Sequence, residues 1–264
     1  MALGLSSTLS KTGFTNPVAG IVTDSLVMKH NYAAGGVVPV SDGAALFDAS
    51  SEVITCGNDT SMDITDDITM TAWVNPTTAG QNAHIVGRDD GTNRNYALFV
   101  NSNAYIFDYF VSGSAHRVTS STADTPSVWV HLACTRDKSS GTNIIYVNGV
   151  AEDTDTDSTA SIDNDDVQFS IGARPAPASP FAGYICNVGL WSGVLTQAQI
   201  KSIMWKNYED LTSSDKDAGT TGSSNIVAWW NLDAEVGSDG NAGSGYVLSE
   251  VAGAGSTTNL GTLT

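Results

Sequence analysis

The chain has 264 residues, of which 41% are hydrophobic, so it holds enough apolar side chains for a sizeable core and global disorder is not expected. Its 28 acidic residues outnumber 11 basic ones. The resulting net charge of −17 repels phosphate backbones and argues against a nucleic-acid partner. No stretch approaches the roughly 18 consecutive apolar residues of a membrane-spanning helix.

The composition favours strands and tight turns over helices. Of the acidic residues, 23 are Asp, which favours turns and caps, and only five are Glu, which favours helices. The 26 Gly and seven Pro are scattered along the chain, as a fold with many tight turns requires.

Residues 1–23 form a polar arm with little periodicity, which is either a disordered tail or an arm that pairs with a neighbouring subunit. The run MALGLSSTLSK has no charged region ahead of a long apolar stretch, so no signal peptide is predicted. Three cysteines lie in strand-like runs, cannot all pair within the chain and show no zinc-type spacing. They are therefore expected to be apolar-like thiols of a protein that folds in a reducing cytoplasm: Cys56, Cys134 and Cys186.

From residue 26 onward, short strand-like runs alternate with turn signals. In Ile68–Val74, and again in Val128–Thr135, apolar residues take every second position, which is the period of half-buried strands. Asn143–Val147 leads into Asn148-Gly149. Asn-Gly is the strongest short-range hairpin signal, because both central residues of a type I′ turn need positive φ.

A buried strand, one helix and a last strand follow. Phe181–Trp191 is apolar on both faces, which predicts a strand covered on both sides. Thr196 and Gln199 form the pattern of a capping box. The short helix that they begin is expected to dock an apolar stripe on a sheet: Ile200, Ile203, Met204 and Tyr208. Ile226–Leu232 predicts a final buried strand, and many strands with one helix predict an all-β fold.

Four blocks of sequence carry a family likeness: AALFDASSEVITCGNDTSMDITDDITMTAWVNP, HIVGRDDGTNRNYALFV, SVWVHLACTRDKSSGTNIIYVNGV and FSIGARPAPASPFAGYICNVGLWSGVLTQAQI. In this order, over about residues 44–205, they resemble the laminin-G-like jelly-roll domains of the concanavalin A-like lectin/glucanase superfamily. The resemblance implies a two-sheet antiparallel jelly-roll sandwich with one short helix. We expect an arm at 1–23, the jelly roll at 24–232, and a Gly/Ser-rich segment at 233–264 that packs on the sandwich or on a neighbouring subunit.

The chain departs from the family pattern in two places. In the fourth block, the family usually has an acidic pair and an Arg, whereas this chain has Cys186, Asn187 and Gly189. Packing therefore replaces an ion pair on this strand. The change also weakens any transfer of the family's ligand or metal roles to it. Ala49 stands where the first block usually has Gly. The runs 26–32 and 226–232 both resemble the family's opening strand, so either one of them completes the sandwich or the two pair with each other.

No catalytic residue is predicted. Retaining glycosidases need two carboxylates about 5–5.5 Å apart, which a strand provides with acids two or four residues apart on one face. The five Glu residues never lie within four positions of one another, and the Glu-x-Asp-x-Glu motif of the glucanase branch is missing. The chain also has no Gly-x-Ser-x-Gly elbow and no phosphate loop, so we do not expect an enzyme.

Calcium is the one cofactor that the sequence leaves open. The stretch EDTDTDSTASIDNDD begins like an EF-hand loop, with Asp153, Asp155 and Asp157 in the first ligand positions. Ser158 and Asn164 then stand where a Gly and a bidentate Glu are required, so an outer strand with solvent-facing aspartates is the preferred interpretation.

A second possibility for calcium is a site at the edge of the sandwich, which jelly rolls of this family often have. Asp48 and Asp89 lie in loop-like positions that could contribute to it, or they could be turn aspartates that bond their own backbone. Neither is assigned as a ligand, and the metal and ligand-binding residues stay unassigned.

Histidines and tryptophans point to no site either. The four histidines show no metal spacing, and His131 takes a position in the family's Trp-x-His pattern where a structural role is expected. Most of the six tryptophans lie in strands, where core packing is expected, and Trp205 on the helix is expected to be the most exposed.

Two functions remain. The first is implied by the resemblance together with the unpaired thiols, the acidity, the terminal arms and the missing signal peptide: a non-catalytic structural protein of a virus particle, such as a bacteriophage capsid decoration, fibre or accessory component. It would be assembled in the host cytoplasm and contact other virion or self subunits through its terminal arms. The alternative is a glycan-binding module for attachment to a host, which would act outside the cell or at its surface. Neither interpretation involves nucleic acid or a membrane, and both can hold for one oligomeric protein.

Overall fold

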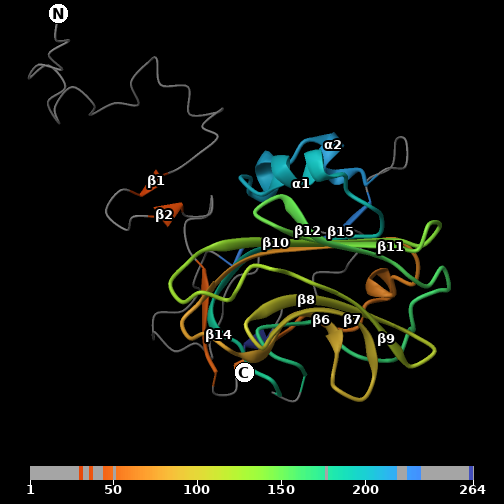
Figure 1. The fold of residues 1–264 in the computed structure, drawn as a ribbon, viewed down its shortest axis with the longest axis horizontal. Coiled ribbons are helices and arrows are strands. Elements are labelled where there is room, and N and C mark those ends of the chain that lie inside the picture. Colours follow the sequence, from red (N-terminus) through yellow and green to blue (C-terminus); the bar gives the residue numbers. More distant parts are fainter. Residues whose placement is uncertain are drawn as a thin grey trace, which may run out of the picture.

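A computed structural model describes residues 44–49, 52–175, 178–218 and 225–232, together with the backbone of three short strands further out in the chain: β1 (His30–Asn31), β2 (Gly36–Val37) and β16 (Thr262–Leu263). The arm at 1–23 and nearly all of the segment 233–264 lie outside the described residues, so the predicted division into three parts stays a prediction. Two antiparallel sheets lie face to face (Figure 1), which confirms the predicted all-β sandwich.

The first sheet, called the β5 sheet here, has the strand order β12–β11–β10–β5–β14–β15, and β3 pairs with the first half of β14. Its strands are β3 (Ala45–Asp48), β5 (Ile68–Pro76), β10 (Val130–Asp137), β11 (Thr142–Val147), β12 (Val150–Thr156), β14 (Ala182–Trp191) and β15 (Ile226–Trp230). The strands predicted over 68–74, 128–135, 143–147, 181–191 and 226–232 all lie in this sheet. The run from Ile226 completes it, since β15 pairs with the second half of β14. The other candidate opening strand, 26–32, lies outside the described residues except for the backbone of β1.

The second sheet, called the β7 sheet, has the order β16–β4–β13–β6–β7–β8–β9. Its strands within the sandwich are β4 (Ile54–Thr55), β6 (Asn82–Asp89), β7 (Arg94–Asn101), β8 (Ala104–Val111), β9 (Ser114–Thr119) and β13 (Ser170–Ile171). Four of them, β6 to β9, follow one another as a meander, so each pairs with the next along the chain. This meander carries the candidate site described below.

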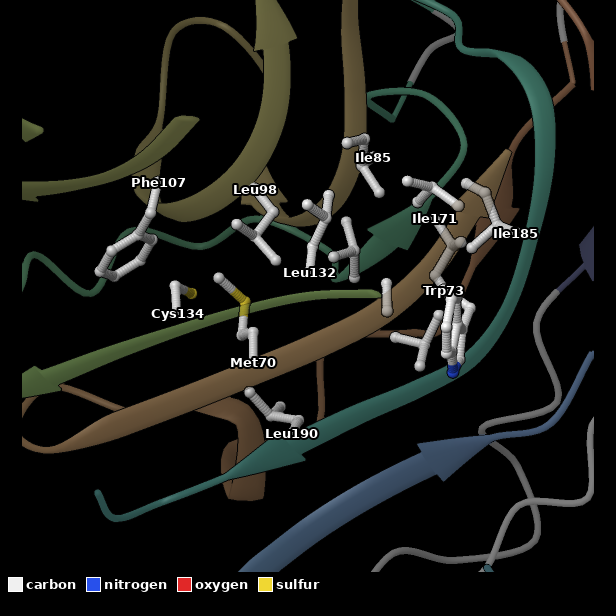
Figure 2. Packing of buried hydrophobic residues seen from close by; sticks show 14 of the residues in the cluster. Met70, Trp73, Ile85, Leu98, Phe107, Leu132, Cys134, Ile171, Ile185 and Leu190 are labelled. Atoms are coloured by element: carbon white, nitrogen blue, oxygen red, sulfur yellow. The ribbon is translucent and has the colours of Figure 1, made fainter. Parts of the chain in front are cut away.

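The core lies between the two sheets. Figure 2 shows side chains that point toward one another across the gap: Ile85, Leu98 and Phe107 from the β7 sheet, and Met70, Leu132 and Cys134 from the β5 sheet. Full burial of such a side chain contributes about 1.5–3 kcal/mol to stability. All three cysteines lie buried as thiols in this cluster, which confirms their predicted apolar role.

The predicted hairpin turn is present at Asn148-Gly149. Val147 pairs with Val150 across it, and the two turn residues have φ values of 50° and 73°. These are the positive angles of a type I′ turn, which Asn and Gly adopt with little strain.

The outer face of the β5 sheet is covered by the segment 192–218. This segment holds helix α1 (Gln197–Ile203), the 3₁₀ turn η4 (Tyr208–Asp210) and helix α2 (Ser213–Lys216). Elsewhere in the chain, a second 3₁₀ turn, η3 (Thr60–Met62), precedes β5. The capping box of Thr196 and Gln199 is confirmed, and the predicted stripe of α1 packs on the sheet. The four-residue helix α2 was not predicted from the sequence.

This cover corrects the prediction that β5 and β10 are half-buried, because both faces of these strands are buried. The Thr69 hydroxyl donates to the Gly193 carbonyl at 2.7 Å and accepts the Leu195 N–H at 3.0 Å. The indole N–H of Trp73 donates to the Met204 carbonyl at 2.7 Å. Thr69 and Trp73 on the second face of the strand thus bind the covering segment instead of water, whereas the buried Thr71 hydroxyl between them has no partner among the described residues.

The departure from the family pattern in β14 also serves packing. A Cβ on Gly189 would lie 2.6 Å from the ring of Trp191 and 2.8 Å from that of Trp229. Without a side chain at this position, the two indoles meet edge to face, with ring centroids 5.9 Å apart.

Within the described residues, no helix is long and apolar enough to span a membrane.

Candidate functional site

The two loop aspartates considered for calcium have other partners. Asp89 ends β6 and is buried, with its carboxylate 2.9 Å from Nη2 of Arg174 and 3.6 Å from Nε of Arg94. The backbone N–H of Asp48 donates to the Glu52 carboxylate at 2.6 Å. In the described part of the chain, no group of three or more His, Cys, Asp or Glu side chains could hold a metal ion. Asp89 is neutralised by arginine and is not available to a cation.

The acidic stretch after the Asn148-Gly149 turn forms the edge strand β12, as predicted, but its acids do not all face water. Asp153 accepts the Thr119 N–H at 2.8 Å, and Asp157 lies 2.5 Å from Nδ1 of His116. Burial of Glu152 is outweighed by hydrogen bonds from Thr122 and a neighbouring serine, so its pKa lies below the ordinary value. The acids join β12 to the β9 edge of the other sheet, and this is why the solvent-facing prediction is wrong in part.

The tryptophans are mainly structural. Four of them are buried, as expected, whereas both Trp205 and Trp129 are half-buried. The prediction that Trp205 is the most exposed is therefore not borne out over Trp129. Trp205 follows α1 instead of lying on it, and Trp129 precedes β10 instead of lying within it. His131 packs its ring against Trp73 with centroids 5.3 Å apart, and burial lowers its pKa to about 3. A neutral imidazole in the covered layer fits the predicted structural role.

A hollow of about 210 Å³ lies on the outer face of the β7 sheet, and we call it the arginine pocket. Strands β6 to β9 supply most of its lining, and the loop after β13 supplies Arg174 and Ser179. Strand register brings the lining together, because His84 pairs with Phe99, and Asp108 pairs with Arg117. Their neighbours in sequence face the core, so these side chains point outward.

Two arginines cover aromatic rings on this face. The guanidinium of Arg117 lies over the Phe99 ring at 5.3 Å, and that of Arg94 lies over the Phe110 ring at 5.4 Å. Such contacts contribute about 0.5–1 kcal/mol at exposed sites. The arginines therefore do on this face what helix α1 does on the other: they shield apolar side chains from water.

Buried carboxylates hold two arginines of the pocket, Arg117 and Arg174. Nε and Nη2 of Arg117 each donate to Asp108 at 2.6 Å, and this hydrogen bonding raises the pKa of the guanidinium. Asp89 accepts a single hydrogen bond from Nη2 of Arg174 at 2.9 Å and also accepts the Gly91 N–H at 2.6 Å. The side chains of Asp89 and Asp108 are each 5% exposed, so both orient their arginines without reaching solvent.

Two polar atoms beside the pocket lack hydrogen-bond partners among the described residues. They are Nδ1 of His84 and Nε of Arg174, and both are buried. Nε2 of His84 lies 3.3 Å from the Ser170 carbonyl oxygen, and burial lowers the pKa of the imidazole to about 4, so the ring is neutral near pH ~7. A buried polar group without a partner costs free energy, about 1–3 kcal/mol. A ligand that supplies partners would recover it.

Two other hollows, of about 410 and 290 Å³, surround Asp66 and Asp67. They are open depressions, and the Asp66 carboxylate there is already paired with Lys138 at 2.5 Å. None of their lining side chains has a buried polar atom that lacks a partner within the described residues. The arginine pocket is the stronger candidate for a site.

Sequence reasoning did not identify this pocket. Its residues come from four strands and a loop, and no spacing along the chain brings His84, Arg94, Arg117 and Arg174 together. The one signal in the sequence was the scarcity of arginine. The chain has only five arginines, and the structure places three of them in the lining of the pocket.

A family model described as the concanavalin A-like lectin/glucanases superfamily matches residues 48–201, which is more than half of the chain. The chain belongs to this superfamily. The predicted resemblance is thereby confirmed, although the match carries no information on a virus particle. No curated protein is similar enough to match the sequence.

The chain is similar to several solved structures. A protein from Bacteroides ovatus ATCC 8483, assigned as carbohydrate binding, is 20% identical with a TM-score of 0.59, over 86% of this chain and 58% of that one. A heptameric SAP-like pentraxin from Limulus polyphemus is 14% identical, with a TM-score of 0.49, over 64% and 84%. Domain 4 of an extracellular arabinanase from Geobacillus stearothermophilus, in complex with arabinotriose, is 18% identical, with a TM-score of 0.48, over 61% and 76%. The first likeness establishes the fold alone, and this chain spans only 58% of that protein's length.

Proposed function

We propose that the chain is a non-catalytic glycan-binding module whose ligand occupies the arginine pocket. One observation carries this proposal: a hollow on the outer face of a lectin-type sheet is bordered by buried polar atoms, Nδ1 of His84 and Nε of Arg174, that have no partner within the described residues. Sugar hydroxyls both donate and accept hydrogen bonds, so they suit such atoms.

The other lining groups fit the same ligand. Asn82 and Asn101 bring amide groups to the rim, and the half-buried ring of Phe99 gives an apolar surface. A small number of polar groups beside an aromatic surface is the usual composition of a site that orients a small ligand. The Bacteroides ovatus protein is assigned to carbohydrate binding, which supports the proposal at the level of the fold.

The pocket is poorly suited to glycoside hydrolysis. A retaining or inverting mechanism needs two carboxyl groups with different protonation states. Asp108 is the one carboxylate among the described residues that line the hollow, and both of its oxygens accept from Arg117. That the chain is no enzyme stays a prediction, which assays of glycan hydrolysis can check.

A glycan array tests the proposal. The wild-type protein should bind a subset of glycans, and Asn82→Trp, which places an indole on the exposed rim of the pocket, should abolish that binding. Thr154→Trp, on the exposed edge strand β12, is the matched control and should leave binding unchanged. If both variants bind as the wild type does, the ligand lies elsewhere.

A virion location is a second proposal, and it is compatible with the first. It is supported by three buried thiols, which suit folding in a reducing compartment, and by the net charge of −17. The module would then attach a bacteriophage particle to surface glycans. The presence of capsid and tail genes beside its gene, or of the protein in purified particles, would support this location, and its absence from particles would contradict it.

A further inference from the structure

We infer that the arginine pocket binds the carboxylate of an acidic sugar, an inference that rests on the proposed glycan-binding function and names its ligand class. Its first support is the distribution of positive charge. The chain has five arginines and a net charge of −17, yet three arginines line this one hollow. In so acidic a chain, that concentration requires a reason.

Several carboxylates share the positive charge of this hollow. Three guanidinium groups, of Arg94, Arg117 and Arg174, face two carboxylates, of Asp89 and Asp108. Asp165 also lies close, but its carboxylate accepts the backbone N–H of Arg94, at 3.3 Å, and not its guanidinium. Asp90 also interacts electrostatically with Arg174, so the carboxylates nearby are at least as many as the guanidinium groups. What the pocket offers an anionic group is therefore hydrogen-bond donors and not an excess of charge.

The arginines also keep N–H groups available. Arg117 spends Nε and Nη2 on Asp108, and no hydrogen bond within the described residues involves its Nη1. Arg94 spends Nε on the Gly91 carbonyl at 3.0 Å, and neither Nη1 nor Nη2 bonds there. Their side chains are 49% and 37% exposed, so these N–H groups can meet a ligand. A guanidinium matches a carboxylate in shape and binds it in bidentate fashion.

The remaining two arginines show what a structural arginine looks like in this fold. Arg88 is fully buried and donates to the Val167 and Met62 carbonyls, each at 2.9 Å. Arg136 is also buried and donates to the Asp66 carbonyl at 2.6 Å. Both tie loops to the sandwich. Arg94 and Arg117 instead lie at the surface and are held from below, which suits recognition.

The neutral part of the pocket favours a sugar acid over a simple anion. Nδ1 of His84 and the amides of Asn82 and Asn101 would bind hydroxyl groups, while the guanidinium of Arg94 or Arg117 takes the carboxylate. A hollow of about 210 Å³ is small for a ligand site, so it suits one sugar residue of a longer chain.

The test compares matched glycans on the full chain. An array carries each uronic-acid or sialic-acid oligosaccharide beside its carboxyl-reduced form and a sulfated counterpart, and hits are followed by calorimetric titration. We expect the acidic form to bind at least about tenfold more tightly than its reduced form. The reduced form loses one charge-assisted hydrogen bond to a guanidinium, and this loss accounts for the difference.

Two variants locate the effect. Arg94→Gln leaves Asp89 paired with Arg174, so the fold should persist, and binding of the acidic glycan should weaken about tenfold while the reduced form is unaffected. Arg117→Gln is combined with Asp108→Asn, because a buried Asp108 without its arginine would destabilise the sheet. Lys138→Gln, at a surface ion pair outside the pocket, is the control and should change nothing.

The outcomes separate the two proposals. Equal binding of acidic and carboxyl-reduced forms, with loss of both in Asn82→Trp, would overturn this inference and leave the glycan-binding proposal standing. Tighter binding of the sulfated form than of the carboxylated one would also overturn it. If no glycan binds at all, the proposed function falls and this inference falls with it.

Discussion

The two outer faces of the sandwich solve the same problem in different ways. On the β5 sheet, a segment of the chain covers the strands, and Thr69 and Trp73 hydrogen-bond to its backbone. On the β7 sheet, Arg94 and Arg117 lie over the rings of Phe110 and Phe99, and a hollow remains between the side chains. The covered face is closed to ligands, and the arginine face is accessible.

Buried polar atoms without a partner occur on both faces among the described residues, including Thr71 Oγ1 and His131 Nδ1 beneath the cover. The faces differ in whether such atoms border a hollow. The indole of Trp191, beneath the cover, donates to the Asp215 carbonyl at 3.1 Å, so the chain itself supplies its partner. On the arginine face, Nδ1 of His84 and Nε of Arg174 have no partner among the described residues, and both residues line the hollow. Polar groups left unpaired at a surface hollow indicate where stability has been given up for binding.

The largest expected difference between the faces is in stability. Trp191→Ala should lower the free energy of unfolding by about 3–5 kcal/mol, because it leaves a cavity under the cover and an unpaired carbonyl. Phe99→Ala, on the half-exposed arginine face, should lower it by only about 1 kcal/mol. Urea denaturation of both variants measures the contrast. Equal losses would show that the arginine face is packed as tightly as the covered one.

The next prediction concerns pH and affects both faces. Burial lowers the pKa of His84 to about 4 and that of His131 to about 3, against 6.5 as the ordinary value. Between those values the unfolded chain binds more protons than the folded one, so the free energy of unfolding falls as the pH falls. Each imidazole should account for about 2 kcal/mol between about pH 7 and about pH 5.

Denaturation at a series of pH values, with His84→Gln and His131→Gln as single variants, checks this dependence. Each variant should remove about half of the loss seen in the wild type over that window. A wild-type stability that stays constant from about pH 7 to about pH 5 would show that these two imidazoles titrate normally in the folded state.

The smallest effect is expected at a turn that belongs to neither face. Ala49 follows β3 with φ at 68°, where a side chain costs about 1–2 kcal/mol, and the family pattern has Gly there. Ala49→Gly should raise the free energy of unfolding by about 1 kcal/mol, somewhat offset by the flexibility of Gly in the unfolded chain. Glycan binding should not change, since Ala49 does not line the pocket. A loss of stability would mean that the turn adapts to Ala.

Local signals in the sequence predicted local structure well. Asn148-Gly149 and the Thr196–Gln199 capping box are each complete within four residues, and both are present. The alternation of β5 and β10 gave their inner face correctly. It could not tell that their second face is covered, because Thr69 and Trp73 find partners more than a hundred residues away along the chain.

The candidate site could not be predicted from local signals, because its residues also find their partners far along the chain. Asp89 was considered for calcium because its neighbours in sequence indicate a loop, whereas its charge is neutralised by Arg174, 85 residues later. The register between β6 and β7 also shifts between His84 and Val86, which no periodicity reveals. Position in a sheet of this kind is decided by pairing, and pairing partners are not adjacent in sequence.

Side-chain ¹⁵N NMR of the full chain tests the central claim most directly, because both faces report in one experiment. During titration with an acidic glycan found on the array, the Arg174 Nε–H and His84 ring signals should shift and saturate together. The Trp73 and Trp191 Nε1–H signals, on the covered face, should stay in place. Shifts confined to those indoles, or no shift in the arginine and histidine signals at saturation, would contradict the account.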